Sequence, residues 1–397
     1  MNIKMVSDNI KCISKKVIDE VISLRRTLHK YPEPGFKEFQ TSSLISATLD
    51  RLGLEVKTNM AKTGVCAVLS NERDGKTVAV RSDMDALPIT ECTSLPYASV
   101  NSGTMHACGH DVHMAIVLGA AMILSRMKEE LNGSVKCIFQ PAEEGLGGAR
   151  YMIEDGALKN PDVDAIIAAH IKPSLDTGKI IIGEGPVMAS PGEFRITITG
   201  KGGHAAEPHK STDPVVIAAN LVGMLQTIIT RETNPVKNAL ISVTCINAGN
   251  TYNIIPDTAQ IKGTVRTFDK DVEMHIKKRM EEMSVKLSEA YGASCRFEYD
   301  EGYPPVVNNK RIASLVAQAA EKITGKENVI TDADPSMLAE DFSYYAGKVP
   351  GAMFFLGCTN SEKGPQNLHS SRLDIDEKCI RIGMEVLAQF CVDFLEN

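Results

Sequence analysis

Residues 105–127, MHACGHDVHMAIVLGAAMILSRM, place one cysteine and three histidines directly before a strongly apolar helix. A β-rich run stands on each side of this stretch, TVAVRSD at 77–83 and VKCIFQP at 135–141. Strands that alternate with apolar helices indicate a sheet that is at least partly parallel. The stretch therefore predicts an α/β fold with chemically reactive side chains just before one of its helices.

The same alternation continues outward along the chain. Apolar residues at helical spacing predict helices at 17–31 and 42–53, interrupted by PEPG at 32–35. Further β-rich runs and helical segments are expected in the following places: strands at 64–70, 165–171, 179–185 and 351–357, and helices at 311–325 and 378–396.

The middle of the chain predicts a second unit, starting at about residue 188. Six elements follow in the order β-α-β-β-α-β, which is the ferredoxin-like arrangement. They are strand 193–201, helix 213–232, strand 240–249, strand 259–268, helix 271–292 and strand 294–300. Because the strand at 351–357 resembles those of the first unit, we interpret the middle unit, 188–301, as an insertion between 1–187 and 302–397.

Length and composition set the class of protein. A chain of 397 residues with 43% hydrophobic residues is expected to form two domains. The formal net charge is −7, and Lys and Arg are scattered along the chain, so no basic cluster suited to nucleic acid or an anionic membrane surface is evident. This favours a small-molecule partner. We find no signal peptide and no run long enough to span a bilayer, and the ten cysteines are irregularly spaced, so we expect reduced thiols in the cytoplasm.

Polar residues follow several of the expected strands. Asp83 and Asp85 end one run, Glu143 and Glu144 end the next, and His170 ends the run at 165–171. Ligands in open α/β sheets bind beyond the carboxyl ends of the strands, so these groups are expected to converge. Each of them alone has an ordinary reading as a core residue or a solvated turn, and their recurrence after strands is what favours a common site.

Five residues offer the thiolate, imidazole and carboxylate ligands that suit borderline divalent metals. They are Cys108, His110, Glu144, His170 and His369. Five ligands exceed one tetrahedral site, whereas two ions sharing a bridging ligand would use them all and leave room for a hydrolytic water. Cys108 is then a metal-bound thiolate rather than a redox thiol.

The neighbouring acids have separate roles in this hypothesis. Adjacent glutamates cannot point the same way in an extended segment, so one can bind metal while the other faces the water as a general base. Asp83 and Asp85 would orient an imidazole ligand or tune the charge of the metal.

The middle unit offers three further candidates. His204 lies in GKGGHAAEPH, on a glycine-rich turn ahead of a helix, and could donate to the oxyanion of a tetrahedral intermediate. Asn253 in NTYNIIPD and Arg266 in GTVRTF lie on the same unit, and Arg266 could pair with a substrate carboxylate. A loop histidine and a surface ion pair are the ordinary readings of His204 and Arg266.

Taken together, these motifs resemble one family over nearly the whole chain, in order. They are RRTLHKYPEPGFKE, RSDMDALPI, MHACGHDVHMA, FQPAEEGLGGA, GKGGHAAEPH, NTYNIIPD, GTVRTF, AEDFSYY and LHSSR. The chain resembles the metal-dependent amidohydrolases and peptidases that include aminoacylase-like enzymes, hippurate hydrolase, auxin-conjugate hydrolases and N-acetyldiaminopimelate deacetylase.

The resemblance implies a two-domain α/β fold: a di-metal catalytic domain of the phosphorylase/hydrolase-like, zinc-exopeptidase type, with an inserted ferredoxin-like α+β lid. It implies two divalent ions (Zn, Mn, Co or Ni) on the five ligands, with Cys108 bridging. Glu143 falls at the general base, His204 at the lid histidine, and Asp83 and Asp85 at the acidic strand end.

The activity that the resemblance implies is hydrolysis of N-acyl amino acids to a carboxylic acid and a free amino acid. Relatives dimerise through the lid, so a homodimer or homotetramer is expected, and His204 could serve its own or a partner's site. Ser371, Leu373 and Leu338 depart from the family pattern at what we take to be the pocket rim, so they bear on substrate choice.

Three alternatives stay open. A metallo-dipeptidase or carboxypeptidase of the same superfamily is the nearest rival, and Cys108 favours the amidohydrolase. A cysteine hydrolase with Cys108 as nucleophile would be active in the presence of a chelator. A noncatalytic binding relative would have lost the base, but Glu143 and Glu144 are both present.

Overall fold

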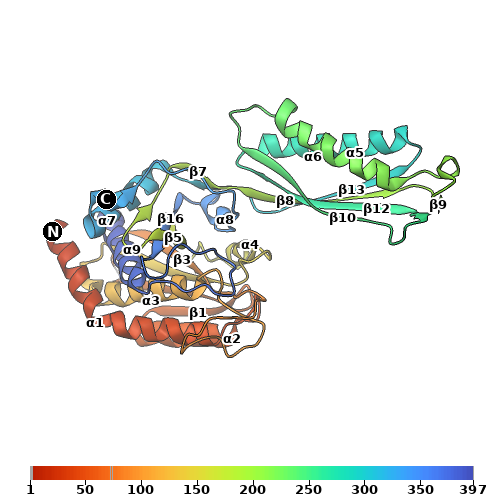
Figure 1. Ribbon diagram of the computed structural model, residues 1–397. Coiled ribbons are helices and arrows are strands. Elements are labelled where there is room, and N and C mark those ends of the chain that lie inside the picture. Colours follow the sequence, from red (N-terminus) through yellow and green to blue (C-terminus); the bar gives the residue numbers. More distant parts are fainter. Residues whose placement is uncertain (1–2, 72, 74, 397) are drawn as a thin grey trace. The chain divides into compact units, whose positions relative to one another are not determined.

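The computed structural model describes residues 3–71, 73 and 75–396. The described chain forms two compact units, shown in Figure 1 and treated separately below. Unit 1 comprises Met1–Val187, Val307–Asp334 and Asp341–Asn397, and unit 2 comprises Met188–Val306 and Pro335–Glu340.

Unit 1 is built on a mixed sheet whose described strands run in the order β1-β2-β4-β3-β5-β16-β6-β15. The neighbours β4, β3, β5 and β16 pair in parallel, and β1, β2 and β4 pair antiparallel. The strands are β1 (Glu55–Met60), β2 (Gly64–Ser70), β3 (Lys76–Asp83), β4 (Gly133–Gln140), β5 (Ala165–Asp176), β6 (Ile180–Ile181), β15 (Val329–Ile330) and β16 (Gly351–Thr359).

Helices α3, α7 and α9 of unit 1 pack against this sheet, and α1 packs on α3 and α9 (Figure 1). Every residue of α3 from His110 to Leu124 is buried, which explains why this helix is apolar on all its faces. The central strand β3 is likewise almost wholly buried, as parallel strands covered by helices are. The helices are α1 (Ile3–Lys30), α2 (Phe39–Arg51), α3 (His110–Arg126), α4 (Gly148–Glu154), α7 (Lys310–Thr324), α8 (Ser343–Ala346) and α9 (Lys378–Glu396), with 3-10 turns at Lys128–Glu130 and Lys326–Asn328.

Unit 2 has the expected β-α-β-β-α-β order, and its antiparallel sheet runs β10-β12-β8-β13. Figure 1 shows α5 and α6 side by side on one face of this sheet. Alternate residues of β8 are buried, as in a sheet with one covered face. The main elements are β8 (Ser190–Thr199), α5 (Pro214–Thr227), β10 (Ala239–Ala248), β12 (Thr258–Thr267), α6 (Lys270–Ala290) and β13 (Ser294–Glu301).

Shorter elements complete the described chain. They are β7 (Gly185–Met188) paired with β14 (Val306–Asn308), β9 (Gly203–His204) paired with β11 (Ile254–Ile255), the 3-10 turn Pro208–Lys210, and the π-helical turn Ile228–Glu232. The α/β fold with an inserted ferredoxin-like unit is thus confirmed.

One sequence expectation about helices needs correction. The helical stretch Pro214–Glu232 is long and apolar enough, by length and composition, to cross a membrane. Part of that apolar character has a local explanation, because Ile217, Leu221, Leu225 and Ile228 are buried in the core of unit 2. The expectation that no run reaches this length was therefore wrong.

Two strands also differ from their predicted extents. β5 continues to Asp176, so His170 lies inside this strand and not after it, opposite Phe355 of β16. The run at 179–185 is divided between β6 and β7, with Gly183 between them. β1 was not predicted, because its residues EVKTNM are mostly polar and exposed.

Candidate metal centre

Strand register brings the acidic residues and one histidine to the same level of the sheet. Asp83 at the end of β3 lies opposite Gln140 at the end of β4. Arg81 of β3 lies opposite Ala168 of β5, so His170 comes two residues further along, level with Asp83. The carboxyl edge of the sheet therefore gathers these groups, as the sequence predicted.

His110 and His170 both turn Nε2 toward this edge. Nδ1 of His110 lies 2.8 Å from the carbonyl oxygen of Asp85, and Nδ1 of His170 lies 2.8 Å from that of Ile171. A carbonyl oxygen only accepts, so Nδ1 carries a hydrogen in each ring and Nε2 is the atom left for a ligand. Nε2 of His110 is buried without a hydrogen-bond partner among the described residues.

The two imidazoles have opposite electrostatic surroundings. Burial, reinforced by neighbouring His113, lowers the pKa of His170 to about 3, so its ring is neutral. Burial would also lower the pKa of His110, but the negative charge of Asp83 together with the contacts with Asp85 and Cys108 outweighs it and raises that pKa well above its ordinary value. A cation entering the site therefore has to displace a proton from His110.

Two groups of possible ligands share Cys108. The ligand atoms of Cys108, His110 and His170 lie within 4.8 Å of one another, and so do those of Cys108, Glu144 and His369. Sγ of Cys108 lies 3.6 Å from Nε2 of His170, and Nε2 of His369 lies 3.2 Å from Oε1 of Glu144. The structure thus brings all five predicted ligands together, with Cys108 common to both groups.

The second group is a strongly coupled set of polar side chains. Contacts with Cys108 and Glu144 raise the pKa of His369 to about 10. Burial would raise the pKa of Glu144, but its contact with His369 and the charge of His110 keep that pKa low. Burial raises the pKa of the Cys108 thiol. This donor set and the unpartnered Nε2 of His110 fit a pair of divalent ions.

His113 lies beside the site but offers no free ring nitrogen. Its Nε2 accepts from the backbone N of Ile171 (2.9 Å), so its Nδ1 donates to Oδ1 of Asp83 (2.7 Å). Oδ2 of Asp83 accepts from Nη1 of Arg81 (2.9 Å) and lies 3.7 Å from Nε2 of His110. Burial alone would raise the pKa of Asp83, but the charges of His110 and Arg81 hold it well below its usual range.

Asp85 holds the turn that carries both glutamates. Its Oδ1 and Oδ2 accept from the backbone N–H groups of Glu143 and Glu144, each at 3.0 Å, and its carbonyl oxygen accepts from His110. Asp85 therefore orients the glutamate turn with its side chain and His110 with its backbone. Ala142, just before the two glutamates, has φ +57°, a left-handed conformation that costs a non-glycine residue about 1–2 kcal/mol.

Sequence reasoning missed a buried ion network beneath the first turn of α3. Oδ2 of Asp111 lies 2.8 Å from Nε of Arg25 and 2.8 Å from Nδ1 of His29, and Nε2 of His29 lies 3.3 Å from Glu91. Asp111 directly follows His110, so this network ties α1 to the turn that carries Cys108 and His110. RRTLHKY contributes to the predicted helix 17–31 and to the family resemblance. Arg25 and His29 are four residues apart on one face of that helix, which is a signal for a polar pair, but nothing in the sequence indicates Asp111 as their partner.

A second missed residue is Glu38, which is fully buried between α2 and the glutamate turn. Its carboxylate accepts from the backbone N of Ala142 (3.0 Å) and from the hydroxyl of Thr63. Burial raises its pKa to about 7. His106 is also buried, its pKa is lowered to about 4 by burial, and neither ring nitrogen has a hydrogen-bond partner among the described residues.

The remaining candidates lie on unit 2, described by itself. β9 pairs with β11, so His204 lies opposite Ile254, and the backbone N of Ala205 donates to the carbonyl of Asn253 (3.0 Å). Nδ1 of His204 accepts from the backbone N of Ala206 (3.1 Å), so the neutral ring carries its hydrogen on Nε2. His204 and Asn253 are therefore neighbours.

Arg266 lies on β12 and has no ion-pair partner among the described residues, so the surface ion pair considered for it is absent. Its burial lowers its pKa from the usual value. Of the positions that depart from the family pattern, Leu338 is exposed, whereas Leu373 is part of the core of unit 1. The expectation that Leu373 lies on a pocket rim was therefore wrong.

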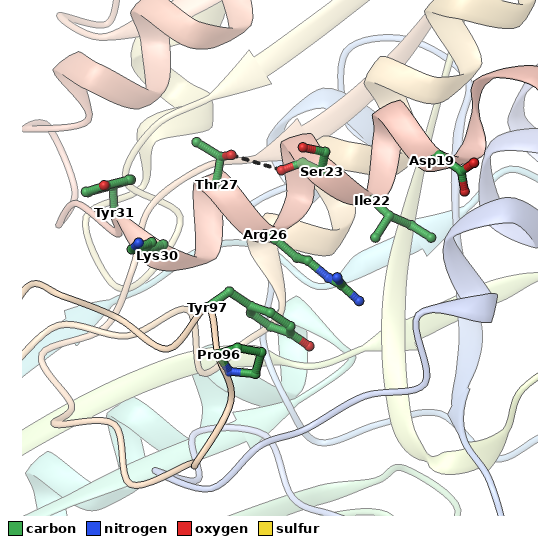
Figure 2. Close-up of a pocket in the computed structure, with 9 residues that line it drawn as sticks. All are labelled: Asp19, Ile22, Ser23, Arg26, Thr27, Lys30, Tyr31, Pro96 and Tyr97. Carbon is green, nitrogen blue, oxygen red and sulfur yellow. Dashed lines mark hydrogen bonds between the residues drawn. The ribbon is translucent and has the colours of Figure 1, made fainter.

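The surface also has hollows away from this centre. Figure 2 shows one of about 660 Å³ beside α1, where the side chain of Arg26 extends toward Tyr97. Cζ of Arg26 lies 4.9 Å from the centre of the Tyr97 ring, and Nη2 of Arg26 pairs with Glu377 at 2.6 Å. None of the five predicted ligands lines this hollow.

Comparison with known proteins places the chain in a family. Residues 79–393 match the peptidase family M20/M25/M40. The chain is 42% identical over 361 residues to an N-acetyl-L-cysteine deacetylase of Bacillus subtilis (strain 168), covering 91% of this chain and 85% of that protein. It is 39% identical over 394 residues to thermostable carboxypeptidase 1 of Saccharolobus solfataricus, covering 98% of both chains.

A solved structure agrees with these matches. The YXEP protein of Bacillus subtilis, described as a dinuclear metal-binding peptidase of the M20 family, superposes with a TM-score of 0.83 at 36% identity. The superposition covers 96% of this chain and 99% of that chain. The chain described here therefore belongs to the peptidase family M20/M25/M40.

Proposed function

We propose that the protein hydrolyses the amide bond of N-acyl-L-amino acids, giving a carboxylic acid and a free amino acid. The observation that carries this proposal is the pair of ligand groups sharing Cys108, with Glu143 next to the ligand Glu144. Family membership and the similarity to an N-acetyl-L-cysteine deacetylase support the choice of reaction. The acyl group is acetyl, benzoyl or a similar group.

The cofactors we propose are two divalent ions, of Zn, Mn, Co or Ni. Cys108 would bridge them, His110 and His170 would complete one side, and Glu144 and His369 the other. When bound, such ions polarise an amide carbonyl and lower the pKa of water.

Residues of the chain itself provide proton transfer and hold the other groups in position. Glu143 accepts the proton of the attacking water as the water oxygen bonds to the amide carbon, and returns it to the nitrogen as the C–N bond breaks. Glu143 is buried, which keeps bulk water from competing for that proton. Asp83 and Asp85 fix the imidazoles and the glutamate turn.

In this proposal residues 188–301, which make up most of unit 2, act as the lid of a catalytic domain formed by 1–187 and 302–397. His204 would donate from Nε2 to the oxyanion, in its own or a neighbouring subunit, because its Nδ1 is already an acceptor. Asn253 and Arg266 would bind the substrate, and the half-buried Arg266 suits a carboxylate partner.

The finer assignments of assembly and location are also proposals. We propose a homodimer or homotetramer that works on small molecules in the cytoplasm, without nucleic acid or membrane as a partner. The ten cysteines are all unpaired in the described residues, which suits a reducing compartment. Light scattering on the protein as it elutes from a size-exclusion column would measure the number of subunits. Fractionation of the cells that produce the protein would show its compartment.

A carboxypeptidase is the second candidate, because a thermostable carboxypeptidase is 39% identical over 98% of the chain. The deciding experiment is an assay for amine release from N-acetyl, N-benzoyl and N-succinyl amino acids and from dipeptides. The metal-reconstituted protein is compared with the EDTA-treated protein and with Glu143→Gln.

Release from acyl amino acids that EDTA and Glu143→Gln both abolish is the expected result. Release from dipeptides alone would favour the peptidase, and release that survives EDTA would favour a Cys108 nucleophile. No release from any substrate, with two ions bound, would favour the noncatalytic binding relative.

A further inference from the structure

The turn that carries Glu143 and Glu144 has no secondary structure of its own to fix it. It leaves β4 at Gln140 and enters α4 at Gly148. Gly145 and Gly147 both adopt positive φ within it, as Ala142 does at its start. A segment that bends this way depends on side chains from elsewhere for its position.

Asp341 binds the turn at both ends. Its Oδ1 and Oδ2 accept from Nε2 of Gln140 (2.9 and 2.8 Å), and Oδ2 also accepts from the backbone N of Ala149 (2.9 Å). Gln140 lies directly before the turn and Ala149 is the second residue of α4. One carboxylate, about 200 residues later in the chain, therefore spans the whole segment.

The charge of Asp341 is balanced within the protein interior. Its Oδ1 accepts from Nη2 of Arg81 (3.0 Å), and Nε of Arg81 donates to Gln140 (2.9 Å). Asp341 and Arg81 are both almost fully buried. The same guanidinium donates to Asp83, so the pair is continuous with the group that orients the imidazoles. A buried ion pair whose two charges are both hydrogen-bonded holds its partners in place, and removing one of them leaves an uncompensated buried charge.

The partners of Asp341 require a carboxylate and not an amide. The backbone N–H of Ala149 and the guanidinium of Arg81 can only donate, and they meet different oxygens. An asparagine would place its NH2 group against one of these donors. Asp341→Asn therefore removes the negative charge and at least one of these hydrogen bonds, with almost no change in side-chain volume.

We propose that Asp341 is a positioning residue that fixes the 140–149 turn and so places Glu143 for proton transfer. This inference rests on the proposed role of Glu143. A carboxylate oxygen of Glu143 lies within 4.8 Å of one of Asp341, so a shift of the turn reaches the base directly. A displacement of about 1 Å is enough to lower a rate about 100-fold.

The experiment compares Asp341→Asn with the wild type in the metal-loaded full chain. We expect kcat to fall at least tenfold while KM stays within twofold and two ions per chain are retained. Amide hydrogen exchange in peptides covering 141–149 should become faster, with β16 and α9 unchanged. Glu143→Gln, measured in parallel, reports on the proposed function itself, whereas the exchange data report on Asp341 alone.

Asp393→Asn is the matched control. Asp393 is also buried and accepts from a glutamine amide, that of Gln389 (2.9 Å), and from a cation, Lys322 (2.8 Å), but it lies on α9. We expect it to lower the melting temperature without changing kcat per metal-loaded chain. A general loss of stability would move both variants alike.

Gln140→Leu tests the same idea if Asp341→Asn does not fold, since it removes one end of the attachment and keeps the Asp341 to Arg81 pair. We expect a smaller fall in kcat and faster exchange confined to the turn. Unchanged exchange at 141–149, or a kcat within twofold of wild type in both variants, would overturn the proposal.

Discussion

Two backbone carbonyl oxygens, those of Asp85 and Ile171, decide which nitrogen of His110 and of His170 faces the candidate centre. The sequence predicted both histidines as ligands, because His170 ends a β-rich run and His110 lies in the stretch rich in cysteine and histidine between two such runs. It could not indicate which ring nitrogen is presented, since that depends on an acceptor 25 residues away in one case and on the adjacent peptide in the other.

The side chain of Asp85 has a separate role, because its two oxygens hold the turn that carries Glu143 and Glu144. Replacing Asp85 with Asn puts an NH2 group against the N–H of Glu143 or Glu144, so one of the two loses its acceptor. We expect metal affinity to fall about 10- to 100-fold, as is typical when a group that orients a ligand is changed. Isothermal titration of the apo protein with Zn²⁺ measures this.

The control for that experiment is Asp176→Asn. Asp176 is exposed and forms a surface pair with Lys179 at 3.4 Å, so its replacement should leave Zn²⁺ affinity unchanged. An Asp85→Asn protein that binds Zn²⁺ like the wild type would show that the carboxylate is dispensable for the site.

Glu38 makes a prediction about pH and stability. Its pKa is raised to about 7 from 4.5, so between these values the folded protein binds more protons at this residue than the unfolded chain. The contribution of Glu38 to stability therefore falls as the pH rises from 4.5 to 7, by about 1.4 kcal/mol for each pKa unit. We therefore expect the melting temperature of Glu38→Gln minus that of the wild type to be larger at pH 8 than at pH 5.5, with both proteins measured without metal.

Glutamine suits this test because the hydroxyl of Thr63 can accept as well as donate, so both hydrogen bonds of Glu38 can be kept. A gap between the two melting temperatures that does not change with pH would contradict the assignment of the titration to Glu38.

At the scale of elements, the pattern of the chain predicted most of the sheet and missed its polar edge. Runs such as AIIAAHI and GAMFFLG are apolar because their strands are covered on both faces, as expected where strands and helices alternate. β1 and the seven-residue α4 lack that pattern. The contacts of Asp341, Glu38 and Asp111 join distant segments, and no local pattern encodes them.

The start of α3 has a backbone requirement that the sequence shows only as a glycine. Gly109 is the N-cap residue, has φ +85°, and stands between Cys108 and His110. A Cβ there would lie 2.2 Å from Cδ1 of Ile171. Gly109→Ala should therefore destabilise the protein by the left-handed penalty of about 1–2 kcal/mol and by this clash.

A double mutant cycle measures how much of the loss comes from the contact between the added Cβ and Cδ1 of Ile171. Ile171→Val removes Cδ1, so Gly109→Ala should cost less free energy of unfolding in that background than in the wild type. Urea unfolding of the four proteins measures the difference. Equal costs in both backgrounds would mean that contact with Cδ1 adds nothing to the loss; Cγ1 of residue 171, which would lie 2.7 Å from the added Cβ, is present in both.

At the scale of the whole molecule, the five proposed ligands all belong to unit 1. An ion that binds only the folded form of unit 1 stabilises that unit and leaves the other unchanged. We expect calorimetry of the metal-loaded protein to resolve two unfolding transitions, of which EDTA lowers only one.

Hydrogen exchange followed in individual segments can assign each transition to one unit. Hydrogen exchange during heating should show that the EDTA-sensitive transition belongs to β3, β5 and α3, and that the insensitive one belongs to α5 and α6. A chelator that shifts both transitions equally would mean that the units unfold together.

The insertion of unit 2 also sets an order of events during synthesis on the ribosome. Residues 188–306 form a nearly complete unit from one continuous stretch, whereas β5 must wait for β16 to emerge before the sheet of unit 1 can be completed. Four of the five proposed ligands are made before this stretch, and His369 follows it. Unit 2 can therefore fold while the proposed set of metal ligands is still incomplete, and that set becomes available only after His369 has been made.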